Sequence, residues 1–137
     1  MKRPAGGNAA STWRTVPICL REIRANGGAR YALDGQLAIL LRRLPPDASI
    51  LMYLGDHGGA LERASIPLRR TLNEANQHEW PAALQNPAGS ADYIVAADGD
   101  PVAEAVRRHP EGLRIVGVVE APSQPPVRIY RPIRSGT

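Results

Sequence analysis

The stretch that decides the fold is ADYIVAADGDPVAEAVRRHPEGLRIVGVVE, residues 91–120. Its first part, Asp92–Ala97, is a short apolar run of the kind that a strand buried on both faces presents. Asp100 and Pro101 follow as an N-cap and a first helical position, because a carboxylate accepts from free helical N–H groups and proline lacks one. A short amphipathic helix then leads to Leu113–Val119, a second strand rich in branched residues. This order of strand, helix and strand predicts a sheet on which the helix packs.

The rest of the chain supplies elements of the same kind. Leu33–Leu44 is the strongest predicted helix, and its broad apolar face places Ile39 and Leu40 in the core. Val127–Tyr130 is expected to pair with Leu113–Val119 as an antiparallel hairpin at a sheet edge. The other predicted elements are a buried strand at Ser49–Leu54, helical turns at Ala60–Ala64, a strand at Ile66–Leu72, a short helix at Glu79–Leu84 and a loop at Asn86–Ser90. The alternation predicts an α/β fold: a three-layer sandwich with a mostly parallel sheet and an antiparallel C-terminal edge hairpin.

The length indicates one domain. A chain of 137 residues is long enough for a single substantial core. We expect a disordered N-terminal segment at residues 1–15, a single α/β domain at residues 16–132 and a tail at residues 133–137. Val16–Ile23 is apolar, and its pattern fits a strand or a short helix equally well.

The composition argues against several classes of protein. The net charge is +4, and the basic residues stand singly or in pairs, such as Arg42-Arg43 and Arg69-Arg70, so no basic stripe indicates nucleic-acid binding. Cys19 is the one cysteine, which excludes an intrachain disulfide and a cysteine-based zinc site. No run approaches the ~18 apolar residues of a transmembrane helix, and Pro4–Ser11 lacks the apolar core of an export signal. We expect a soluble chain with no cofactor.

A glycine-rich turn is the first candidate for a functional site. Gly55-Asp56-His57-Gly58-Gly59 follows a buried strand, which is where α/β folds bind phosphates through backbone N–H groups. Its spacing matches neither the dinucleotide-binding nor the P-loop fingerprint. We favour the alternative, a structural turn whose glycines supply positive φ angles.

Acidic groups could meet this turn at one edge of the sheet. Asp98 and Asp100 follow the predicted strand within Asp92–Ala97, and the loops after parallel strands emerge at the same edge. Together with Asp56 and His57, they could bind an anionic ligand, hold a metal or exchange protons. We expect Asp100 to turn inward to the amides of its own helix and His57 to be exposed. The sequence therefore predicts no catalytic residue and no metal site here.

Trp80 is the other candidate. It stands near Asn73, Glu74 and Asn76, and a tryptophan among amides can stack on the apolar face of a sugar. The alternative is a tryptophan that caps the core beside a polar loop. The candidate ligand-binding residues are Gly55, Asp56, His57, Gly58, Gly59, Asp98, Asp100 and Trp80.

A further pattern lies in short segments spread along the chain. They are Leu44-Pro45-Pro46-Asp47-Ala48, the strand with Tyr53 and Gly55, Pro67-Leu68-Arg69-Arg70, Asn73-Glu74, Trp80, Ala83-Leu84, Pro87 and Ala91-Asp92-Tyr93-Ile94-Val95. At this spacing they resemble the soluble C-terminal region of bacterial membrane glycosyltransferases of the protein-mannosyltransferase type. The resemblance covers about Val16 to Pro132.

The resemblance implies an accessory role. In that family, an extracytoplasmic α/β domain follows a bundle of transmembrane helices, and the enzyme takes sugar from a polyprenyl-phosphate carrier. The catalytic acidic residues lie in the membrane part, so none transfers to this chain. The resemblance implies a non-catalytic domain on the periplasmic side of the inner membrane, as a fragment or a freestanding relative. Its partners would be the transmembrane part of the glycosyltransferase or the acceptor.

The residues alone leave two alternatives to an accessory domain. One is a freestanding small α/β module that binds an anionic ligand. The other is an uncharacterised hydrolase. Both would use the loops at Gly55–Gly59 and Asp98–Asp100.

Overall fold

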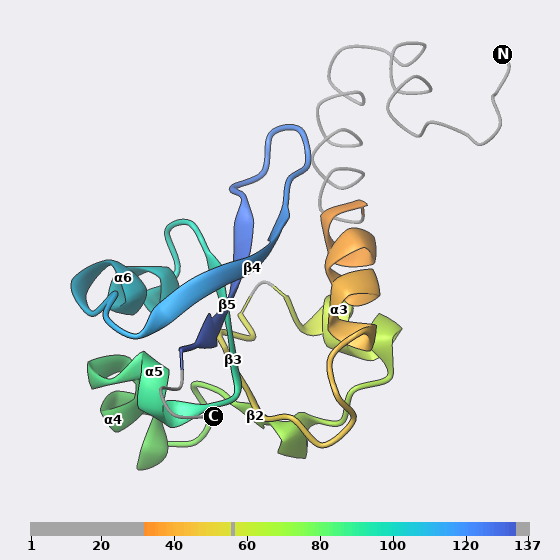
Figure 1. Cartoon of the computed structure of the whole chain (residues 1–137). Helices are drawn as coiled ribbons and strands as arrows, with labels where there is room; N and C mark the ends of the chain where they lie inside the picture. Colours follow the sequence, from red (N-terminus) through yellow and green to blue (C-terminus); the bar gives the residue numbers. More distant parts are fainter. Residues whose placement is uncertain (1–31, 56, 134–137) are drawn as a thin grey trace, which may run out of the picture.

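The computed structural model describes residues 32–55 and 57–133. Within them, five strands form one mixed sheet in the order β2-β1-β3-β5-β4 (Figure 1). The strands are β1 (Ile50–Met52), β2 (Thr71–Leu72), β3 (Tyr93–Ala97), β4 (Leu113–Val119) and β5 (Val127–Pro132). The helices are residues 32–42, α3 (Gly58–Ala64), α4 (Glu79–Gln85), α5 (Pro87–Ser90) and α6 (Pro101–Arg108).

Helices cover both faces of the sheet. The helix at residues 32–42 packs with α3 on one face, in an apolar group that we call the first cluster and that includes Leu37 and Leu61. Helices α4 and α6 pack on the other face, in a second cluster that includes Ala83 and Val102. Figure 1 shows α4, α5 and α6 across the sheet from α3. The predicted three-layer α/β sandwich is confirmed.

Strand β3 contributes to both clusters. Val95 and Ala97 belong to the first cluster, and Ile94 and Ala96 belong to the second, as the period of two along a strand requires. These four residues are between 0% and 5% exposed. The prediction of a strand buried on both faces within Asp92–Ala97 is therefore confirmed.

Strands β4 and β5 form the predicted antiparallel hairpin at the sheet edge. Strand β5 lies between β3 and β4 and is antiparallel to both, whereas β1 pairs in parallel with β2 and β3. The register shifts between Ile115 and Gly117, which marks a β-bulge. As the edge strand, β4 leaves Ile115, Val116 and Val118 between 46% and 52% exposed.

The helix at residues 32–42 ends before the predicted Leu44, and its predicted apolar face is partly wrong. Leu37 and Leu41 are buried on one line of the helix, because side chains four residues apart share a face. Ile39 falls on another side and is 46% exposed. Leu40 is only partly buried against the first cluster, so it lies at the margin of the core rather than within it.

The predicted strand at Ser49–Leu54 is shorter than expected, and two other segments were predicted wrongly. Only Ile50–Met52 pairs as a strand. The segment Ile66–Leu72 holds a 3-10 turn, in which the Pro67 carbonyl accepts from the Arg70 N–H at 3.0 Å, before the two residues of β2. The expected loop at residues 86–90 contains α5, because proline at its first position suits a helix start.

Some predicted segments cannot be compared. Residues 1–15, Val16–Ile23 and most of the tail at residues 133–137 lie outside the described residues. In the part of the chain that the structure describes, no helix is both long and apolar enough to span a membrane.

Candidate functional site

The site lies at the carboxyl ends of strands β1 and β3, where the chain leaves the two strands on opposite faces of the sheet. Strands β1 and β3 are parallel neighbours, so their carboxyl ends lie together. The chain leaves β1 toward α3 and the first cluster, and it leaves β3 toward α6 and the second cluster. Such a switch point opens a crevice beyond the strand ends, which is where open α/β sheets bind ligands.

A hollow of about 320 Å³ occupies this crevice, and we call it the switch-point hollow. Its volume lies within the range of small-molecule sites, about 300–1,000 Å³. The lining residues are Leu33, Tyr53, His57, Ala97, Asp98, Gly99, Asp100, Pro101, Gln124 and Pro125. They come from four separate segments, so the fold and not one motif builds the hollow.

The structure brings together part of the predicted site. His57, Asp98 and Asp100 all line the switch-point hollow. Asp56 lies outside the described residues. The predicted residues that do not line the hollow are Gly55, Gly58, Gly59 and Trp80. Both predicted loops therefore contribute residues to the hollow, and the glycines of the first loop do not line it.

His57 is buried, so the prediction of an exposed histidine is wrong. Its side chain is 7% exposed, and its Nδ1 lies 3.7 Å from Oδ1 of Asp34. Both atoms are enclosed and have no hydrogen-bond partner. The prediction missed a contact with a distant element: Asp34 belongs to the helix at residues 32–42, and its carboxylate lies beside the His57 ring. Since Nδ1 is enclosed and His57 lines the hollow, a hydrogen bond from the ring to a ligand there would have to use Nε2.

The glycines of the turn make room for neighbouring side chains. A Cβ at Gly55 would lie 2.5 Å from the Tyr53 ring, and a Cβ at Gly59 would lie 2.9 Å from Oδ2 of Asp34. Neither glycine has a positive φ angle, so the predicted reason for the glycines is wrong. Because the two glycines have no side chain, Tyr53 can lie close to the backbone at Gly55, and Asp34 can lie close to the backbone at Gly59.

Asp100 caps α6, as predicted. Its Oδ1 accepts from the Ala103 N–H at 2.7 Å, and its Oδ2 accepts from the Ala97 N–H at 3.3 Å. Burial raises the pKa of Asp100 above its ordinary value, and the hydrogen bonds from Ala103 and Ala97 and the charge of His57 only partly oppose this effect. Because the Asp100 carboxylate accepts from the Ala103 N–H, this amide in the first turn of α6 is not available to an anionic ligand.

Asp98 is held by an arginine from β5. Nη1 of Arg128 lies 2.6 Å from Oδ1 of Asp98. Two carboxylates thus line the hollow, and both have partners: Asp98 pairs with Arg128, and Asp100 accepts from backbone amides.

Trp80 belongs to the core rather than to the hollow. It packs against the second cluster, and its ring centroid lies 6.5 Å from that of Tyr53. The polar residues near it hold a turn, because Glu74 accepts from the Leu54 N–H at 2.8 Å and the Asn76 side chain accepts from a backbone N–H at 2.9 Å. This arrangement favours the alternative in which Trp80 caps the core. Trp80 contacts the ring of Tyr53, and Tyr53 lines the hollow.

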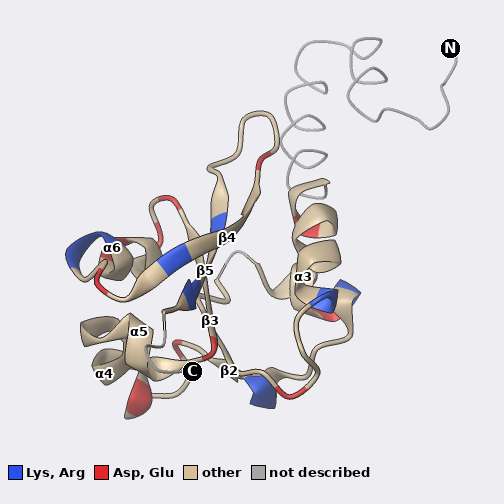
Figure 2. Cartoon of the chain, in the orientation of Figure 1, with Lys and Arg blue, Asp and Glu red and all other residues tan. Residues whose placement is uncertain are grey.

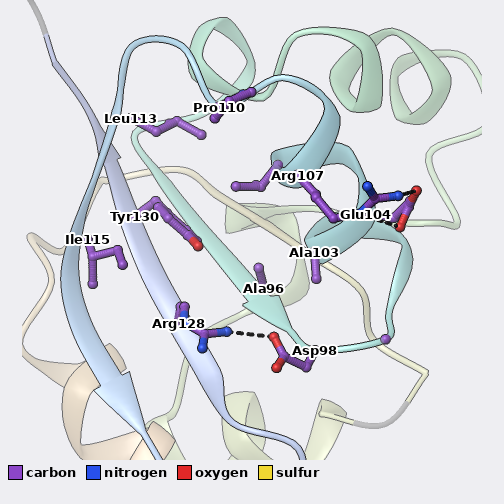
Figure 3. Close-up of a pocket in the computed structure, with 12 residues that line it drawn as sticks. Ala96, Asp98, Ala103, Glu104, Arg107, Pro110, Leu113, Ile115, Arg128 and Tyr130 are labelled. Carbon is purple, nitrogen blue, oxygen red and sulfur yellow. Dashed lines mark hydrogen bonds and ion pairs between the residues drawn. The ribbon is translucent and has the colours of Figure 1, made fainter.

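A larger hollow of about 640 Å³ was not predicted. We call it the α6 groove, because it lies between α6 and the outer strands (Figure 3). Its lining residues are Ala96, Asp98, Gly99, Ala103, Glu104, Val106, Arg107, Pro110, Leu113, Ile115, Arg128 and Tyr130. The alternation of residues along β5 could have indicated this groove. Arg128 and Tyr130 share one face of the strand, and Val127 and Ile129 share the opposite face.

The basic residues are dispersed in space as well as in sequence. Figure 2 shows them on separate elements, among them α6, β4 and β5, rather than along one continuous face. Among the described residues, no group of three or more His, Cys, Asp or Glu side chains could hold a metal ion. The candidate site is the pair of hollows that share Asp98 and Gly99 in their linings.

No protein-family model, no curated protein and no solved structure matches the chain.

Proposed function

We propose that this chain is a non-catalytic domain that binds a neutral, hydroxyl-rich ligand in the switch-point hollow, as an accessory domain of a membrane glycosyltransferase. One observation carries the proposal. His57, Asp98 and Asp100 come from two loops at neighbouring strand ends, and they line one hollow of small-molecule size.

The charge of the hollow supports a neutral ligand. An anion would meet the carboxylates of Asp98 and Asp100. The Ala103 N–H at the start of α6, which could bind an anion, already donates to the Asp100 carboxylate. A cation would have to compete with Arg128 for Asp98. This balance weighs against the anionic ligand that the sequence left open.

The hollow is lined by both hydrogen-bond donors and acceptors, which favours a ligand that carries hydroxyl groups. Carboxylate oxygens accept hydrogen bonds, whereas the Gln124 amide and the imidazole of His57 can both donate and accept. A hydroxyl is the simplest group that satisfies donors and acceptors at once. The ring of Tyr53 adds an apolar surface, which suits the C–H face of a sugar.

The accessory role rests on the resemblance to the glycosyltransferase region. A domain that binds sugars would meet the acceptor or the donor sugar of such an enzyme on the periplasmic side. Hydrophobic spans encoded directly upstream of Met1 would support this part of the proposal, and a coding sequence that begins at Met1 without such spans would weigh against it.

Titration calorimetry and amide chemical shifts of the whole chain with methyl α-mannoside and methyl α-glucoside test the proposal. We expect binding that His57→Gln weakens at least about tenfold, which corresponds to about 1.4 kcal/mol. His109→Gln is the matched control, because His109 lies at the other end of α6 and does not line the hollow. No binding, or equal loss in both variants, would contradict the proposal.

A second candidate function rests on the buried pair of His57 and Asp34. A carboxylate beside Nδ1 is the arrangement that orients a histidine for proton transfer at Nε2, so the pair could activate water in a hydrolase. A hydrolysis screen on activated esters and phosphates tests it. Turnover lost in both His57→Gln and Asp34→Asn, and kept in His109→Gln, would replace the binding domain with an enzyme.

A further inference from the structure

The switch-point hollow and the α6 groove adjoin at one turn. Asp98 and Gly99 line both. Gly99 has a φ of +92°, and a Cβ built on it would meet no atom within 4 Å. The surface of the turn is therefore open, and a ligand that fills one hollow can continue over Gly99 into the other.

The α6 groove repeats the chemistry of the switch-point hollow. Figure 3 shows Tyr130 projecting from β5 into the groove and Arg128 reaching Asp98 at one end. The opposite wall is α6, where Ala103 leaves space and Glu104 pairs with Arg107 at the rim. Each hollow is thus lined by a tyrosine and by Asp98, whose carboxylate pairs with Arg128.

We infer that the two hollows are subsites of one elongated site, and that its ligand is a linear neutral oligosaccharide rather than a single sugar. This inference rests on the proposed function, because it names the length of the ligand that the switch-point hollow receives. One sugar unit would occupy the switch-point hollow beside His57, and the next units would cross Gly99 and lie along Tyr130.

The geometry favours a chain over a monosaccharide for two reasons. The groove has about twice the volume of the switch-point hollow, 640 Å³ against 320 Å³, so a single small unit would leave most of the site unfilled. The ion pair of Asp98 and Arg128 stands where the hollows meet, with side chains 50% and 36% exposed. Paired charges of this kind can accept from and donate to hydroxyls on both sides without attracting a net charge.

The test is binding measured against ligand length. The whole chain is titrated with methyl α-mannoside and methyl α-glucoside, and then with the linear α-linked di-, tri- and tetrasaccharides of each. We expect the affinity in at least one series to rise at least about tenfold from the monosaccharide to the tetrasaccharide, since the second hollow adds its contacts. Amide shifts should spread from His57 and Asp98 to Tyr130 as the chain lengthens.

Two variants separate the subsites. Ala103→Gln fills the α6 groove from its helical wall and should remove the gain with length while monosaccharide binding stays unchanged, because Ala103 does not line the switch-point hollow. Gly99→Asn places a side chain over the turn that joins the two hollows and should also remove the gain with length. Because Gly99 lines both hollows, unchanged monosaccharide binding is expected of Ala103→Gln alone. Gly112→Asn is the matched control for Gly99→Asn, since Gly112 also has a positive φ angle, +78°, and lines neither hollow.

The outcomes distinguish the two proposals. Monosaccharide binding at His57 without a gain in either series would overturn the elongated site and leave the proposed function standing. A gain with length that survives both Ala103→Gln and Gly99→Asn would also overturn it, because the added units would then lie elsewhere. No binding by any member of either series would overturn both.

Discussion

Strands β3 and β4 have similar compositions and opposite surroundings. Strand β3 is YIVAA and lies in the middle of the sheet with Ile94 0% exposed, whereas β4 is LRIVGVV and lies at the edge with Ile115 52% exposed. Helices cover both faces of β3, and the α6 groove leaves the inner face of β4 open. Position in the sheet, and not apolar content, therefore decides which branched residues form the core and which line a hollow.

The largest expected effect is on β3. Ile94→Ala should lower the free energy of unfolding by about 2–5 kcal/mol, because it removes a fully enclosed side chain and leaves a cavity in the second cluster. Denaturant unfolding followed by circular dichroism measures the change. A midpoint within error of the unaltered protein would show that β3 is not the centre of the core.

A smaller effect is expected at the end of β3, where Asp100 connects the strand to α6. Asp100→Ala should cost about 0.5–2 kcal/mol, since two backbone N–H groups lose their acceptor. The same denaturant experiment measures it. If Asp100→Ala were as stable as the unaltered protein, the cap would not hold α6 in place.

The ionisation of Asp100 gives a prediction for pH. Burial raises its pKa in the folded protein above the ordinary 3.8, so the folded state takes up this proton more readily than the unfolded state. The contribution of this group to stability is therefore fully present below pH 3.8 and is lost as the pH rises through the raised pKa. The stability of the unaltered protein relative to Asp100→Asn should fall over that interval. A flat or rising difference would contradict the burial of Asp100.

The smallest effect is expected on β4. Ile115→Ala should change the free energy of unfolding by no more than about 0.5 kcal/mol, because the side chain is half exposed and lines the α6 groove. Thermal and denaturant unfolding both measure this change. A loss close to that of Ile94→Ala would mean that something covers β4 and that the contrast between the strands is wrong.

The sequence predicted the features that depend on neighbouring residues. Asp100 and Pro101 identify the start of α6 because a cap acts within one helical turn. The apolar run of β3 and the alternation of elements predict the layers, since each pattern is local. The β4–β5 hairpin follows for the same reason.

The features that the sequence missed depend on distant contacts. Asp34 and His57 lie on different elements, so neither the burial of His57 nor its orientation can be read from the turn that contains it. The roles of Gly55 and Gly59 depend on which side chains approach them. The α6 groove exists because β5 lies between β3 and β4, and strand order is a property of the whole chain.

An amide chemical-shift titration of the whole chain with methyl α-mannoside and methyl α-glucoside shows whether the switch-point hollow binds a sugar. If the switch-point hollow is the binding site, at least one of the sugars should shift the signals of His57, of residues 98–101 and of Gln124. The signals of Asn73–Gln77, which lie in the turn near Trp80, should stay in place. Shifts centred on that turn, or no shifts with either sugar, would contradict binding in the switch-point hollow.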